Sequence, residues 1–160
     1  MPREFHTARE LSEAVGKSLG ASDWLTVEQQ RIDRFADATD DHQWIHVDVP
    51  RAAAGPFANT IAHGYLTLSL VNALLPQLIA VPTAALAINT GCHKVRFPAP
   101  VPAGSRIRAL GELAAVTPVD GVGGGVDVVV RVTIEIEGHA KPACVAETVR
   151  RFLFEPPSVP

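Results

Sequence analysis

The spacing of apolar residues changes character about halfway along the chain. Residues 86–97, 105–117, 126–137 and 142–154 are long strand-like runs, separated by segments rich in Pro and Gly. In 126–137, apolar residues alternate with mostly polar ones, which predicts a strand with one buried and one mostly wet face. The spacing of the four runs predicts an antiparallel meander, with the glycine-rich stretch 118–125 as a flexible hairpin tip.

The first half shows helical spacing instead. Ile32, Phe35 and Ala36 recur at i, i+3 and i+4, which predicts a helix over residues 28–38. Residues 61–75 are apolar on nearly every helical face, so this second helix should be surrounded by protein on all sides. The proline that follows it should end or kink the helix.

The remaining segments complete an α+β pattern. Residues 1–22 should form loop with at most a short helix, 24–27 a short strand, and 47–60 a long irregular or briefly helical connection of the kind that often forms a lid or binding segment. A short strand, two helices and four long strands predict one domain over residues 1–160, in which a curved antiparallel β-sheet wraps around a long buried central α-helix. Such a sheet leaves open strand edges, which predicts a homodimer.

Composition and charge narrow the classes of partner. The chain has 160 residues, is 47% hydrophobic and 19% charged, and carries a formal net charge of -3, so nothing drives it toward nucleic acid or an anionic membrane. No charged side chain occurs between Arg51 and Lys94, but Asn72 and two prolines within that run favour a buried helix and strand over a membrane span. The start of the chain lacks the apolar stretch of a signal peptide, which predicts a cytoplasmic protein.

Neither cysteines nor histidines suggest a metal site. Cys92 and Cys144 are isolated, so we expect two buried, reduced thiols rather than a zinc module or a disulfide framework. His42 and His46 are four residues apart, but turn-forming residues flank His42, so they do not share a helix face as paired ligands would.

The candidate chemistry lies in residues 41–46 and 61–65. A carboxylate and an imidazole five positions apart, Asp41 and His46, can converge on one water molecule as a general acid/base pair; the alternative is a helix-ending Asp and a loop His. Gly64, near the start of the apolar helix, offers an unobstructed N–H to a developing oxyanion, or else allows close packing. The neighbouring His63 and Tyr65 are more typical of packing or loop anchoring than of catalysis.

These two motifs resemble the MaoC-like, (R)-specific enoyl-CoA hydratases, which have the hotdog fold. Asp41 and His46 match the family's Asp, any residue, Asn-Pro, aliphatic, His pattern, and the helix opening Ile61, His63, Gly64 and Leu66 matches its second motif. The segment 94–101 is similar to the family's strand after that helix. Gln43 and Trp44 replace the usual Asn-Pro, as in the NodN-like branch, and Asn72 stands where some members have a substrate-positioning serine.

The resemblance implies (R)-specific syn hydration of a trans-2-enoyl-CoA to a (3R)-3-hydroxyacyl-CoA, within fatty acid metabolism. It implies that Asp41 and His46 activate water and that the Gly64 N–H forms the oxyanion hole. No cofactor is implied, because the CoA thioester is the substrate. Candidate substrate-binding residues are Gln43, His63, Tyr65, Asn72, Lys94 and Arg96. Lys94 and Arg96 would either hold CoA phosphates or lie on a solvated strand face. A hotdog thioesterase and a non-catalytic acyl-CoA-binding module stay open as alternatives.

Overall fold

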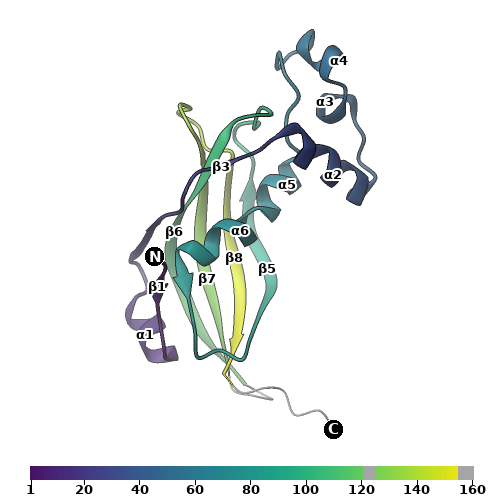
Figure 1. Ribbon diagram of the computed structural model, residues 1–160. Helices are drawn as coiled ribbons and strands as arrows, with labels where there is room; N and C mark the ends of the chain where they lie inside the picture. The colour runs from purple at the N-terminus through teal and green to yellow at the C-terminus, as the bar shows by residue number, and fades with distance from the viewer. Residues whose placement is uncertain (121–124, 155–160) are drawn as a thin grey trace.

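One antiparallel sheet forms the centre of the computed structural model, which describes residues 1–120 and 125–154 (Figure 1). Its strands follow the order β2-β6-β7-β8-β5, and β3 also pairs with β6. Their bounds are β2 Ser18–Ala21, β3 Leu25–Thr26, β5 Leu86–Arg96, β6 Arg106–Val119, β7 Gly125–Ile136 and β8 Cys144–Leu153. Residues 121–124 of the predicted hairpin tip at 118–125 lie outside the described residues.

The sheet is a meander only in part. Strands β6, β7 and β8 pair in sequence order as predicted, but β5 pairs with β8 at the far edge and not with β6. The reason is that a strand has two hydrogen-bonding edges, and those of β6 are taken by β7 on one side and by β2 and β3 on the other. The prediction of an uninterrupted four-strand meander was therefore wrong.

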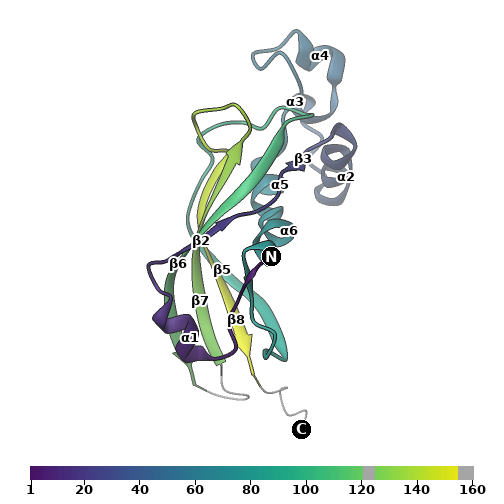
Figure 2. The same cartoon turned by 60° about the vertical axis from the view of Figure 1, so that its left-hand side comes forward.

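Short helices cover one face and one end of this sheet. Figure 1 shows α5 and α6 lying across one face, while α2, α3 and α4 group beyond one end of the strands. Turning the molecule shows α1 at the opposite end from α4 (Figure 2). A two-stranded parallel sheet joins β1 to β4. The bounds are β1 Arg3–Glu4, α1 Ala8–Glu13, α2 Gln29–Thr39, α3 Trp44–Val47, α4 Val49–Ala53, α5 Gly64–Ser69, α6 Val71–Leu74, a 3-10 turn Leu75–Gln77 and β4 Ile79–Ala80.

The central helix is shorter than its hydrophobic pattern predicts. Residues before Gly64 are extended, because the Ile61 N–H donates to Ile45 O at 3.0 Å and the Ala62 N–H to Val101 O at 2.8 Å. Ile61 also forms an antiparallel β-bridge with Pro102, so this segment pairs with neighbouring extended backbone and the helix begins only at Gly64. The helix also divides at Leu70, which ends α5 and starts α6 while keeping right-handed helical angles (φ -67°, ψ -14°).

The N-terminal predictions were partly confirmed. The helix predicted at 28–38 is α2, the short helix is α1, and the short strand at 24–27 contains β3. Residues 18–21, expected to be loop, form strand β2 and pair with β6. The segment 47–60 is irregular apart from the short helix α4.

The core lies between the sheet and α5/α6, as the alternation predicts. Val128, Val130, Val132, Ile134 and Ile136 of β7 are buried and belong to the same apolar cluster as the buried leucines of the central helix. The opposite face of the sheet carries ion pairs between neighbouring strands. Of the two cysteines, Cys144 is buried as expected and its pKa is raised by burial to about 11, but Cys92 is exposed, because it lies on the edge strand β5.

No helix within residues 1–120 and 125–154 is long and apolar enough to cross a membrane. The apolar run that raised this question is divided instead between α5, α6, the short strand β4 and the start of β5.

Candidate active site

Asp41 lies just beyond the end of helix α2. The preceding residue, Asp40, ends α2 in the left-handed conformation (φ 57°), which is accessible to Asp and Asn at low cost. This turn leaves the Asp41 side chain 54% exposed. Among the described residues, its Oδ1 accepts a long contact of 3.4 Å from the Gln43 N–H and its Oδ2 lies 3.9 Å from His63 Nε2, so the exposed carboxylate can still accept hydrogen bonds from a bound molecule.

His46 lies on the single-turn helix α3 and is 6% exposed. Its Nδ1 is 2.6 Å from Ile61 O. A carbonyl oxygen can only accept a hydrogen bond, so Nδ1 carries the proton in the neutral ring and Nε2 is left with a lone pair. The fold therefore presents His46 Nε2 as an acceptor.

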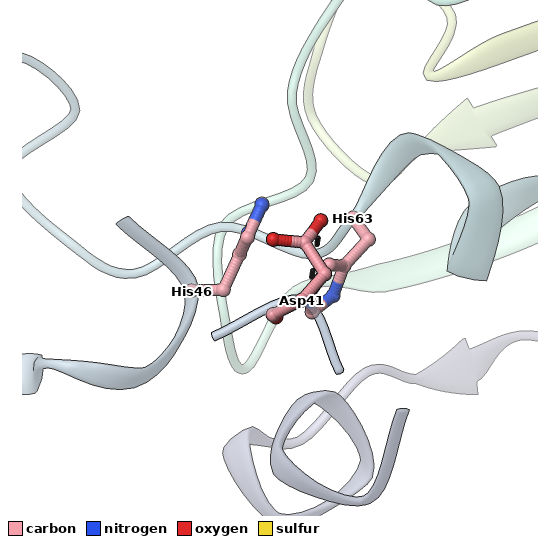
Figure 3. A group of neighbouring side chains, drawn as sticks. All are labelled: Asp41, His46 and His63. Atoms are coloured by element: carbon pink, nitrogen blue, oxygen red, sulfur yellow. Dashed lines mark hydrogen bonds and ion pairs between the residues drawn. The ribbon is translucent and has the colours of Figure 1, made fainter. Parts of the chain in front are cut away.

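His63 connects the two candidate catalytic residues. It precedes α5, is 4% exposed, and its Nε2 donates to the Asp41 carbonyl oxygen at 2.9 Å. Its ring stacks on that of His46, with centroids 3.7 Å apart and planes inclined by 25°, and the centroid of the Phe35 ring of α2 lies 5.1 Å from that of His63. Figure 3 shows the Asp41, His46 and His63 side chains gathered from three separate segments.

A half-buried glutamine fixes the backbone behind this group. Gln29 Nε2 donates to His46 O and to Asp33 Oδ1, both at 2.8 Å, and Gln29 Oε1 accepts from the fully buried Thr60 hydroxyl. Gln29 therefore ties α2 to α3 and to the segment that enters α5. The sequence analysis missed this residue, because its partners are 17 and 31 positions away and no local pattern marks them.

Gly64 is the first residue of α5, where backbone N–H groups have no acceptor within the helix. A Cβ atom built on Gly64 would lie 3.2 Å from the Phe97 ring, so glycine permits this close approach. Gly64, His46, Thr67 and Phe97 line one cavity of about 320 Å³. His46 and the first residue of α5 therefore border the same cavity.

Comparison with known proteins identifies the family. The model of the MaoC-like domain matches residues 10–135, which is more than half of the chain. The chain belongs to the MaoC-like dehydratase family. A 3-hydroxyacyl-thioester dehydratase Z from Mycobacterium tuberculosis is 52% identical over 151 residues, covering 94% of this chain and 99% of the relative.

Two further comparisons concern the NodN-like branch and the fold. Nodulation protein N from Rhizobium leguminosarum bv. viciae is 42% identical over 147 residues, covering 89% of this chain and 88% of the relative, which supports the predicted likeness to the NodN branch. The solved (R)-hydratase from A. caviae involved in PHA biosynthesis aligns with a TM-score of 0.64 at 24% identity, covering 85% of this chain and 94% of that one. The hotdog fold is thereby confirmed, and the family places the protein among the hydro-lyases.

One carboxylate and two imidazoles in this site lie close enough together to be considered as ligands of a metal ion. In the part of the chain that the structure describes, Asp41, His46 and His63 offer possible ligand atoms that all lie within 4.8 Å of one another. The stacking of the two rings opposes a shared ion, because imidazole lone pairs lie in the ring planes and those of near-parallel rings do not converge. The arrangement is better suited to two acceptors facing one water molecule.

The remaining candidate residues do not gather at this site. Tyr65 is 72% exposed and lies edge-on to Phe97 at 6.2 Å, and Gln43 is also exposed. Lys94 Nζ lies 3.2 Å from the Glu147 carboxylate, and Arg96 bonds the carbonyl of its neighbour. This pairing agrees with the prediction that Lys94 lies on a solvated strand face.

The pKa of His46 leads to a prediction about pH dependence. Burial lowers this pKa below the ordinary value of 6.5, and the hydrogen bond to Ile61 offsets only part of the shift. A His46 that accepts a proton must be neutral, so activity should be present above the lowered pKa and fall as the pH drops through it. We expect the acidic limb of kcat/KM against pH to have its midpoint below 6.5; a midpoint above 6.5 would assign the limb to another group.

Proposed function

We propose that this protein catalyses (R)-specific hydration of trans-2-enoyl-CoA to (3R)-3-hydroxyacyl-CoA, and the reverse dehydration, in fatty acid metabolism. The observation that carries the proposal is the exposed Asp41 carboxylate beside a buried His46 whose Nε2 is free, with Gly64 on the same cavity. The names of the relatives support it, since one is a 3-hydroxyacyl-thioester dehydratase and another an (R)-hydratase.

In the proposed mechanism, Asp41 and His46 share one water molecule. The water donates one hydrogen bond to the Asp41 carboxylate and one to His46 Nε2, and its oxygen attacks C3 of the enoyl thioester. The proton that the water loses passes to this pair and returns to C2 on the same side of the double bond. Both new bonds form on one face, which gives syn addition, and no atom is left over.

Gly64 has a separate part in this mechanism. As C3 gains the water oxygen, negative charge develops on the thioester oxygen, and the Gly64 N–H donates to it. The positive end of the helix dipole strengthens the interaction. The chemistry uses only the substrate, water and these groups, so we propose that no cofactor takes part and that a CoA thioester is the substrate.

One assay separates this activity from its alternatives. Crotonyl-CoA is incubated with the protein while the absorbance of the enoyl band and the release of free thiol are followed together. Hydration removes the enoyl band without releasing thiol. Thiol release would instead identify a thioesterase, and no change with enoyl-CoAs of any chain length would leave an acyl-CoA-binding module.

We also propose that the protein is a homodimer that joins through strand β5. All residues of β5 except Val95 are exposed, including Leu86 at 40% and Ile88 at 42%, and within the described residues the strand has one unpaired edge. An open edge with exposed apolar side chains is stabilised when a second copy covers it. Light scattering should give twice the mass of one chain, and Ile88→Lys should shift the protein toward the monomer; a wild-type monomer would refute the dimer.

A further inference from the structure

A second polar cluster lies along the helix that begins at Gly64. It consists of Asn72 on α6, Asn89 on β5 and Arg150 on β8, and is called the Arg150 cluster below. Arg150 Nε donates to Asn89 Oδ1 at 3.1 Å, and Arg150 Nη2 donates to Asn72 Oδ1 at 3.2 Å. Asn89 Nδ2 donates to the same Asn72 oxygen at 2.8 Å. Each of the three side chains is therefore bonded to the other two, which fixes the guanidinium in one orientation.

Arg150 places a positive charge on the face of β8 that packs toward the central helix. Residues alternate between faces along a strand, so Arg150 shares its face with Thr148 and the buried Phe152. The next residue, Arg151, points the other way and pairs with Asp127 at 2.8 Å. Burial lowers the pKa of Arg150, but an arginine stays protonated at neutral pH.

This cation has only neutral partners. Within residues 1–120 and 125–154, Arg150 forms no ion pair, whereas its neighbour Arg151 does. The amide oxygens of the two asparagines orient the guanidinium without neutralising it, and the group has five N–H donors, of which these bonds use two. A half-buried charge of this kind is stabilised when an anion binds it, and a guanidinium best matches a carboxylate.

The Arg150 cluster borders a groove that suits an acyl chain. The groove has a volume of about 200 Å³, and the walls beside the cluster include Leu68, Val71 and Leu75 of the central helix. Gly64 precedes Asn72 by eight residues, and Leu70 keeps helical angles between α5 and α6, so the two positions are about 12 Å apart along the helix. An acyl chain whose thioester is at Gly64 would have to run along this side of the helix, from the cavity at Gly64 into the groove, to reach Arg150.

We propose that the groove receives the far end of the acyl chain, and that Arg150, held by Asn72 and Asn89, binds a carboxylate there. The preferred substrates are then enoyl thioesters whose acyl chain ends in a second carboxylate. This inference rests on the proposed function, because it takes the thioester to bind at Gly64.

The test compares matched ligands that differ only at the end of the chain. Isothermal titration calorimetry measures binding of octanoyl-CoA against octanedioyl-CoA, and of decanoyl-CoA against decanedioyl-CoA. For at least one pair, we expect the wild-type protein to bind the dicarboxylic thioester about tenfold or more tightly, since a site with polar donors discriminates strongly against a ligand that leaves them unpaired. Arg150→Gln should remove most of this preference.

The neighbouring arginine supplies the matched control. Arg151→Gln removes a cation from the same strand, but on its opposite face, and should leave the ratio of the two affinities within about twofold of wild type. Arg150→Lys keeps the charge but not the planar guanidinium with its paired N–H donors, so it should retain part of the preference for the dicarboxylic thioester. Thermal unfolding checks that each variant is folded.

Three results would overturn the inference. Equal binding of the two ligands at both chain lengths by the wild-type protein would show that the cluster does not select a carboxylate. Loss of affinity for CoA alone in Arg150→Gln would assign the cation to a CoA phosphate, and conversion of this variant to a monomer would assign it to the subunit interface. These are binding and assembly measurements, so they stand apart from the proposed function, which fails separately if no enoyl thioester is hydrated.

Discussion

Replacing His46 by glutamine is expected to lower turnover of an enoyl-CoA by about 10²-fold or more, the usual contribution of a general acid/base group. Glutamine can keep the hydrogen bond to Ile61 O, but its amide cannot take up and return a proton. Turnover is followed by the enoyl band, and circular dichroism checks the fold.

His42 provides the control for this substitution. It lies four residues earlier, is exposed, and pairs with Asp37 at 2.9 Å, which raises its pKa and keeps it apart from the site. His42→Gln should therefore leave turnover within about twofold of wild type. A near-normal rate for His46→Gln would remove His46 from the mechanism.

Replacing Asp41 by asparagine is expected to cause a loss of similar size, about 10²-fold or more. The substitution conserves shape, and His63 donates to the backbone carbonyl of residue 41, so this hydrogen bond should remain. The variant loses only the negative charge and one acceptor oxygen that would hold the water. The loss should appear mainly in kcat, measured with saturating enoyl-CoA.

The adjacent Asp40 allows a matched control. Asp40→Asn makes the same chemical change one position earlier, at the left-handed residue that ends α2, where asparagine is well tolerated. Its turnover should stay close to wild type. Equal losses in the Asp40 and Asp41 variants would point to a disturbed turn, and no loss in Asp41→Asn would exclude its carboxylate from the reaction.

Much of the fold could be predicted from the sequence, because local patterns encode it. The alternation in 126–137 predicted the buried face of β7, and the apolar run 61–75 predicted a helix against the sheet, although that helix begins only at Gly64. The pairing of β5 with β8 could not be predicted in this way, since it joins residues about 60 positions apart and depends on which strand edges remain free. The single-domain interpretation of residues 1–160 stays a prediction.

The site could be predicted only where short motifs mark it. Asp41, His46 and Gly64 follow from two motifs, and the structure brings the first two together and places Gly64 on the cavity of His46. The roles of Gln29 and Thr60 depend on side-chain contacts between distant segments, which no spacing reveals. Asn72 was a candidate by its position alone, whereas its partner Arg150 is found only once β8 is placed against the helix.

The central claim is that water adds to C3 of an enoyl thioester at a site formed by Asp41, His46 and Gly64. Its most direct test is to run the reaction in water labelled with oxygen-18 and to analyse the product by mass spectrometry and chiral separation. The expected product is an intact CoA thioester with one labelled oxygen at C3 and only the (3R) configuration. Label in the carboxylate of a released acid, or a (3S) product, would contradict it.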